Sequence, residues 1–204
     1  MSGGAKQFLQ RCVLTRSLPY LKQGSTLSIR SQLQTDLRIR SHWRDDGQLS
    51  FTQSKRVLDD VQNELTGHVL LSKNEDRMTS LGREDPHVSV HLLDTEGVER
   101  LQNDGLSDSD DLLSPPPLTP ATDGDEDEGN LLTLDVPDKI NIDCDLSEGG
   151  SVLIESKIEG DVKLKTVQGN ISVQKLRGHN IDLEIGLSRE GKSADSEDIV
   201  ISYE

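Results

Sequence analysis

Two histidines have a spacing that could hold a metal ion. His87 and His91 are four residues apart, which is a metal-ligand spacing on a helix. They lie in "HVSVHLL", where Val88, Val90 and Leu92 alternate with polar residues as in a half-buried strand. On a strand the two side chains would share a face but stand about 13 Å apart. No carboxylate or cysteine completes a ligand set, so we interpret both histidines as solvent-facing and predict no metal site.

The cysteines and the known catalytic motifs offer no further chemistry. Cys12 and Cys144 cannot build a disulfide framework, and neither lies in a CxxC or another metal-ligand spacing. The sequence contains no GxSxG, no P-loop, no GxGxxG after a strand and no HExxH. Pairs of carboxylates, which a glycosidase needs, are inevitable among 37 acids and carry no signal. We predict no catalytic residue, no cofactor and no enzymatic activity.

Four hydroxyl side chains lie where protein kinases act. Ser107 and Ser109 stand among acids in "SDSDD", and Ser114 and Thr119 precede prolines in "SPPPLTP". Phosphate groups there would extend the segment by charge repulsion. The alternative is a chance match. "NIS" at 170–172 is a glycosylation sequon, but we interpret it as the start of a strand.

Charge is distributed unevenly along the chain, whose net charge is −15. Residues 1–44 carry eight basic residues and one acid, whereas residues 45–204 carry 14 basic and 36 acidic residues. The acidic part would repel nucleic-acid phosphates and anionic membranes, so we predict no nucleic-acid partner. No apolar run approaches the roughly 20 residues that span a bilayer, so no transmembrane segment is predicted.

Residues 1–44 are Arg-rich, contain Ser and are nearly free of acids, as in a mitochondrial transit peptide. If this segment formed a helix, most of its basic residues would lie outside an apolar stripe made of Phe8, Leu9, Cys12 and Val13. This composition predicts a mitochondrial protein from which these residues are removed. The alternative is a basic tail without targeting value on a cytoplasmic protein.

The next two segments are expected to contain little structure. Residues 45–101 offer a helix over 54–66, with Ser54 as its N-cap and Gly67 just past its end, and a strand over 87–93. Residues 102–130 contain nine acids, four of the seven prolines and no Lys or Arg. Such a segment cannot bury enough surface to offset its ordering entropy, so it is predicted to be a disordered acidic linker.

A nine-residue repeat sets residues 131–186 apart. The glycines Gly160, Gly169 and Gly178 recur every nine residues, and short alternating apolar runs fill the intervals. Period-2 alternation puts the apolar residues on one face of a strand, and each Gly with Asp or Asn supplies a corner. Strands of equal length with the same residue at each corner predict a chain that winds back over itself. Such a structure is a β-solenoid. The alternative is a β-meander of hairpins, and residues 187–204 are a tail in which "DIVISYE" could cap the stack.

The fold class predicted from these segments is mainly β. A short β-solenoid occupies the C-terminal third, and the remainder is largely disordered with one weak helix. The aromatic fraction of 2% predicts a thin core of Val, Ile and Leu.

The repeat "DVKLKTVQGNISVQKLRG" resembles the putative adhesin family (domain of unknown function 4097). Residues 140–185 more closely resemble a vertebrate family, the family with sequence similarity 185. The resemblance covers about a quarter of the chain and implies a β-solenoid with no established reaction. The repeat stops after Ile185, whereas family members carry many more repeats. We therefore predict a short isoform or fragment, whose open edge would invite self-association.

These observations predict a non-enzymatic interaction or structural module with an unknown protein partner. A surface or secreted adhesin-like protein is the first alternative, because the family name suggests it. A carbohydrate-active β-helix enzyme is the second alternative, by analogy of fold alone.

Overall fold

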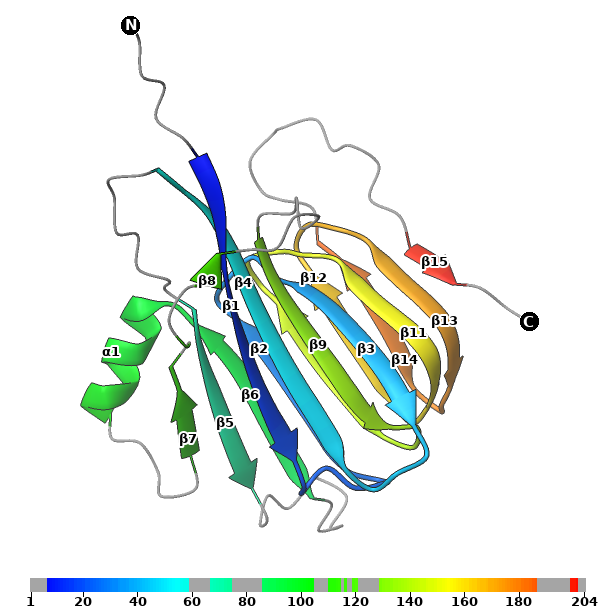
Figure 1. Cartoon of the computed structure of the whole chain (residues 1–204). Helices are drawn as coiled ribbons and strands as arrows, with labels where there is room; N and C mark the ends of the chain where they lie inside the picture. Colours follow the sequence, from blue (N-terminus) through cyan, green and yellow to red (C-terminus); the bar gives the residue numbers. More distant parts are fainter. Residues whose placement is uncertain are drawn as a thin grey trace, which may run out of the picture.

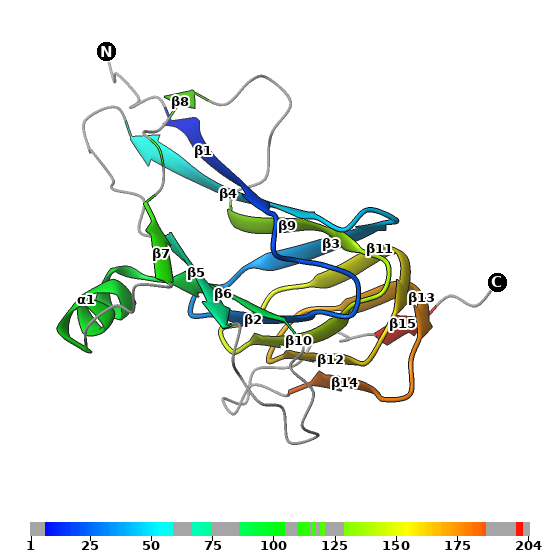
Figure 2. The same ribbon diagram turned by 90° about the horizontal axis from the view of Figure 1, so that it is seen from below.

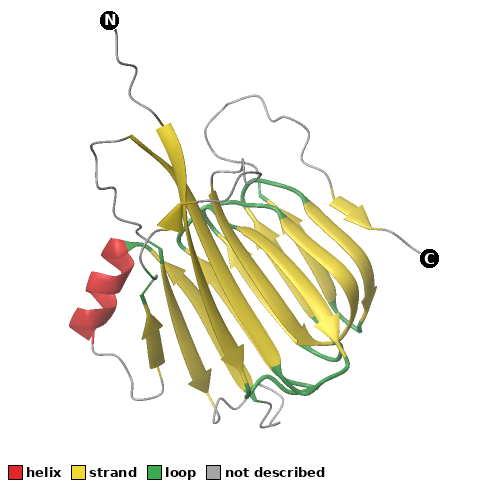
Figure 3. Ribbon diagram, viewed as in Figure 1, coloured by secondary structure: helices red, strands yellow, loops and turns green. Residues whose placement is uncertain are grey.

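Strands form most of the structure. The computed structural model describes residues 7–58, 67–74, 86–104, 110–114, 116, 119–120, 129–186 and 199–201. Within these ranges it contains fifteen strands and one short helix, α1 (Thr95–Asp104), which Figure 3 distinguishes by colour. The strands form two sheets that face each other (Figure 1).

The larger sheet, sheet A, has eight strands, and the smaller one, sheet B, has seven. The order in sheet A is β15 (Ile199–Ile201), β13 (Ile171–Arg177), β11 (Val152–Glu159), β3 (Asp36–His42), β9 (Gly129–Pro137), β4 (Gly47–Leu58), β1 (Gln7–Leu18) and β8 (Thr119–Pro120). The order in sheet B is β14 (Ile181–Ile185), β12 (Val162–Thr166), β10 (Asn141–Leu146), β2 (Thr26–Ser31), β6 (His87–Leu93), β5 (His68–Asn74) and β7 (Asp110–Leu113). Figure 2 shows the sheets close together at β13 and β14 and splayed apart at β1 and β7.

The nine-residue repeat carries the chain from one sheet to the other. Strands β10, β12 and β14 lie in sheet B, and the intervening β11 and β13 lie in sheet A. After crossing to the other sheet and back, the chain forms a strand beside the previous strand of the same sheet. The two strands pair in parallel. Val162 therefore pairs with Ile181, nineteen residues later, and Val152 pairs with Ile171 at the same separation.

The N-terminal strands continue this parallel arrangement in the middle of both sheets. β2 pairs with β10 on one side and with β6 on the other, and both ladders are parallel. β3 lies between β9 and β11, also in parallel. Antiparallel ladders join β1, β4 and β9 in sheet A and β5, β6 and β7 in sheet B. Residues from both halves of the chain therefore build one two-sheet structure.

The core lies between the sheets and contains mainly aliphatic side chains. Burial alternates strictly along β2 and β10, because successive side chains on a strand point to opposite faces. Phe51 on β4 is the largest of the fully buried side chains that the structure describes, and the other large core residues are Leu, Ile and Val. Each fully buried side chain of this size contributes about 1.5–3 kcal/mol.

The helix α1 covers one end of sheet B. The Asp94 side chain accepts a hydrogen bond from the backbone N–H of Gly97 at 2.7 Å, which is the N-cap arrangement. Val98 is buried against Leu70 and Leu93, and the partly buried Leu101 packs against the same cluster. A capping residue and one apolar face therefore explain this helix.

The predicted fold class is wrong in its main point, although the β character is right. Two mixed sheets span most of the chain, so there is no solenoid confined to the C-terminal third beside a disordered remainder. The residues with the composition of a transit peptide include β2 and β3, which lie in the middle of the sheets. Moreover, Gln7–Leu18 forms the strand β1, whereas a transit peptide would form an amphipathic helix there.

The basic residues that suggested a transit peptide contact acids of the later chain. Arg30 Nη2 lies 2.6 Å from Asp143 Oδ2, across the ladder between β2 and β10. Arg38 and Arg40 of β3 both contact Glu155 of β11, at 3.3 and 2.6 Å. The uneven charge distribution therefore reflects pairing between sequence-distant strands. Whether the protein reaches mitochondria stays a prediction.

Two other segments differ from expectation. Ser54, the expected N-cap, lies in β4 opposite Gly129, because β4 pairs on both sides and continues through Leu58. Residues 59–66 of the predicted helix lie outside the described residues. The segment predicted as a disordered linker contributes the end of α1, all of β7 and β8 and the start of β9. By contrast, the strand predicted over 87–93 is confirmed as β6.

Candidate binding pocket

A pocket of about 240 Å³ opens where the two sheets diverge, at the end opposite β14 and β15. Sheet A contributes the end of β1 and the turn that follows it, and sheet B contributes β5, β6 and β7. The volume equals that of about eight water molecules. It is therefore large enough for a small ligand or for one end of a longer one.

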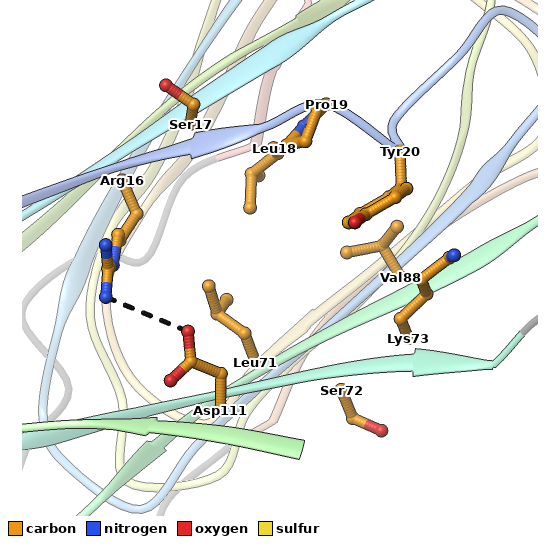
Figure 4. A pocket seen from close by; sticks show the side chains of 10 residues that line it. All are labelled: Arg16, Ser17, Leu18, Pro19, Tyr20, Leu71, Ser72, Lys73, Val88 and Asp111. Atoms are coloured by element: carbon orange, nitrogen blue, oxygen red, sulfur yellow. Dashed lines mark ion pairs between the residues drawn. The ribbon is translucent and has the colours of Figure 1, made fainter. Parts of the chain in front are cut away.

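Apolar side chains form the floor of the pocket. Leu18, Leu71 and Val88 point toward its centre in Figure 4, and Pro19 lies beside them. Leu18 and Val88 are each 5% exposed, so packing fixes their positions. Ser17 and Ser72 also border the pocket, but Figure 4 shows both hydroxyl groups pointing away from it. This floor would favour an aliphatic or aromatic group.

Charged and aromatic groups surround this floor. On one side, Arg16 Nη2 lies 3.8 Å from Asp111 Oδ2, and both side chains are more than half exposed. On the other side, Lys73 Nζ stands 3.9 Å from the centre of the Tyr20 ring (Figure 4). A cation over an aromatic face at this distance gains about 0.5–1 kcal/mol at an exposed site. Among the described residues that line it, the pocket therefore has two cations and one carboxylate, in a chain whose net charge is −15.

Sequence reasoning missed this pocket. Its residues come from four parts of the chain, at positions 16–20, 71–73, 88 and 111, and no local motif joins them. Tyr20 offered the strongest signal, because it is one of two tyrosines in an aromatic-poor chain. Its ring is half exposed rather than buried.

The corner glycines are places where one turn of the chain contacts the next. A methyl group on Gly178 would overlap the carbonyl oxygen of Gly160, and one on Gly160 would overlap the carbonyl oxygen of Ile140. Gly169 likewise lies against Gly150. Any larger residue at these positions would push consecutive turns apart.

Polar residues next to these glycines join the same turns. The Asn141 side chain accepts the backbone N–H of Asp161 at 2.9 Å. One carboxylate oxygen of Asp161 accepts the backbone N–H groups of His179 and Asn180, and the other accepts the Asn180 side-chain amide. These hydrogen bonds, with that of the Asn180 side chain first, hold the pKa of Asp161 below its usual range. The corner residues therefore have a structural part in this fold.

The structure describes two of the four predicted phosphorylation positions. Ser114 is exposed just after β7, and Thr119 lies in the short strand β8. Ser107 and Ser109 lie outside the described residues.

The histidines and cysteines do not form a ligand set in the described part of the chain. His87 and His91 lie on the outer side of β6, and His87 Nε2 is 3.0 Å from Ser89 Oγ. Cys12 and Cys144 are buried free thiols, and burial raises the pKa of each. Among the residues described, no three His, Cys, Asp or Glu side chains gather as a metal site would require. No helix in the same ranges is long and apolar enough to cross a membrane.

Comparison with known proteins shows one distant likeness. No family model and no curated protein matches the chain. The crystal structure of a putative cell adhesion protein from Clostridium sporogenes is similar over 85% of this chain and 68% of its own, with 12% identity and a TM-score of 0.39. Such a likeness carries no argument about function. No matching family model therefore supports the resemblance drawn from residues 140–185.

Proposed function

We propose that this protein is a non-enzymatic binding module. The pocket between the splayed ends of the sheets would hold a compact apolar group that carries a carboxylate. The observation that supports this proposal is the placement of Arg16 and Lys73 on two sides of an apolar floor. Binding sites for small molecules typically combine such a floor with a few polar groups that fix the ligand's orientation.

Arg16 and Lys73 would both contribute to binding the carboxylate. Arg16 pairs with Asp111, and Lys73 stands over the ring of Tyr20. A carboxylate would be attracted by both cations, and Tyr20 would cover the apolar part of the ligand. A hydrogen bond to a charged group contributes about 1.5–3 kcal/mol when its partners are well placed.

Calorimetric titration of the full chain with octanoate, octanol and octylamine tests this proposal. The three probes share an apolar tail and differ in the charge of the head group. We expect octanoate to bind at least about tenfold more tightly than octanol, because about 1.4 kcal/mol corresponds to a factor of ten. Octylamine should bind most weakly, since Lys73 and Arg16 would repel it.

Variants show whether the pocket is responsible. Lys73→Met keeps an apolar side chain of similar length and should reduce the preference for octanoate over octanol. The matched control is Lys175→Met on β13, where the lysine is exposed far from the pocket. Equal affinity for octanoate and octylamine, or an unchanged preference in Lys73→Met, would contradict the proposal.

A further inference from the structure

Strand β14 forms one edge of sheet B. It pairs with β12 along its length, and no strand in the described ranges pairs with its other side. An edge of this kind presents a row of backbone N–H and C=O groups that another strand can bind. The feature lies at the end of the molecule opposite the pocket (Figure 1).

The apolar residues of β14 are only partly covered. Val162 and Leu164 on β12 are 1% and 0% exposed, because strands flank them on both sides. Ile181, which pairs with Val162, is 46% exposed, and Leu183 is partly exposed. A strand added beyond β14 would cover these side chains as β14 covers those of β12.

The outer side of sheet B alternates in charge from strand to strand. On β10 the outward residues are Asp143 and Asp145, and each pairs in register with a lysine of β12. These lysines, Lys163 and Lys165, pair in turn with the acids of β14. Opposite charges on neighbouring strands stabilise a sheet, and like charges directly opposite destabilise it.

The acids of β14 end this alternation. Asp182 and Glu184 face Lys163 and Lys165 on one side, with Lys165 Nζ at 3.4 Å from Glu184 Oε1. Their other side faces the open edge of the sheet. From strand to strand, the outward residues are acidic on β10, basic on β12 and acidic on β14. A basic strand would therefore fit beside β14.

We propose that the outer edge of β14 binds a β-strand of a partner protein in which aliphatic residues alternate with Lys or Arg. The aliphatic residues would cover Ile181 and Leu183, and the basic residues would face Asp182 and Glu184. Backbone hydrogen bonds along the edge would supply affinity, and the charges would select the partner.

A second copy of this chain fits the edge less well. Two β14 strands paired antiparallel, with apolar residues kept on the core side, would place Asp182 and Glu184 opposite acids. The edge strand β7 in sheet B begins with two acids, and the described edges of sheet A are two and three residues long. The occupant that fits is therefore a basic strand from another protein.

Peptide binding to the full chain tests this proposal. The probe is the peptide GDVKLKTVQ, which copies residues 160–168 and so carries the natural neighbour of β14. Its comparison peptide, GDVELETVQ, reverses both charges. We expect the lysine peptide to bind at least about tenfold more tightly by fluorescence anisotropy. Added salt should weaken that binding, because the selecting charges are exposed.

Removing the charges on the protein makes the test specific. The double variant Asp182→Asn with Glu184→Gln puts no like charges opposite Lys163 and Lys165, so its circular dichroism spectrum should match that of the original chain. It should bind the two peptides about equally. An unchanged preference in this variant, or equal binding of both peptides to the original chain, would overturn the proposal. So would sedimentation of the original chain as a dimer that excess lysine peptide converts to monomer, because a second copy would then occupy the edge.

Discussion

At the scale of single residues, Gly178 shows what the nine-residue repeat requires. Its hydrogen faces the carbonyl of Gly160, so the backbones of two consecutive turns touch there. The spacing of Gly160, Gly169 and Gly178 was visible in the sequence because each turn repeats this contact. What each glycine contacts was not visible, since its neighbour lies nearly twenty residues away.

Three alanine substitutions distinguish how a close backbone contact and a strained backbone conformation each affect stability. Gly178→Ala places a methyl group against Gly160, and we expect it to lower the free energy of unfolding by more than about 2 kcal/mol. Gly24→Ala meets nothing within 4 Å, but its φ of +82° should cost about 1–2 kcal/mol. Gly186→Ala makes only ordinary contacts at 3.7 Å and should change stability little.

Urea denaturation of the three variants measures these free energies. The order of destabilisation should be Gly178→Ala, then Gly24→Ala, then Gly186→Ala. Equal stability of Gly178→Ala and Gly186→Ala would show that the corners do not pack as described.

At the scale of elements, the local alternation of apolar and polar residues predicted strands correctly where it was clear. The prediction failed where pairing with distant strands determined the secondary structure. The residues of β6 alternate strictly and were assigned correctly. The end of β4 fits a helical pattern equally well, but its ladders with β1 and β9 make it a strand. In β2 and β3 the alternation was not recognised as a strand pattern because these segments contain basic residues. The acidic partners of those basic residues lie more than a hundred residues away.

The corner at Asp161 belongs to this scale, because it fixes β14 to β12. Asp161→Ala removes the acceptor of three N–H donors on His179 and Asn180, and we expect a loss of about 1–2 kcal/mol at neutral pH. The control is Glu148→Ala, in an exposed turn after β10. Chemical denaturation of both variants measures the difference.

Acid should remove this contribution. The pKa of Asp161 is lower in the folded state than its ordinary value of about 3.9, so its stabilising effect is present above that pH. The effect is lost as pH falls below about 3.9 through the lower folded-state pKa. The difference between Asp161→Ala and the original chain should therefore shrink in acid. A difference that stays constant with pH would show that the carboxylate charge contributes nothing.

At the scale of the whole molecule, the two halves of the chain depend on each other. β2 and β3 contribute Leu27, Ile29, Leu37 and Ile39 to the core, each at most 1% exposed. Their burial is worth about 1.5–3 kcal/mol each, which together approaches the 5–15 kcal/mol of a typical domain. The sequence showed the β character of the molecule, but it could not show that distant strands join in one sandwich. The pocket escaped prediction for the same reason.

Deletion tests this dependence. We expect residues 45–204 alone to show a coil-like circular dichroism spectrum and no cooperative unfolding, because β1, β2 and β3 are absent. The full chain should unfold in one cooperative transition in urea. A cooperative transition of 45–204 at the midpoint of the full chain would contradict the described sheet order.

The most direct test of the binding proposal is a nuclear magnetic resonance titration of the full chain with octanoate. We predict that the amide signals of residues around the pocket, such as Leu18, Tyr20, Leu71 and Val88, shift in a saturable manner. Signals of β12 and β14, at the opposite end of the sheets, should stay in place. Shifts confined to the far end, or no saturable shift at the pocket, would contradict the proposal.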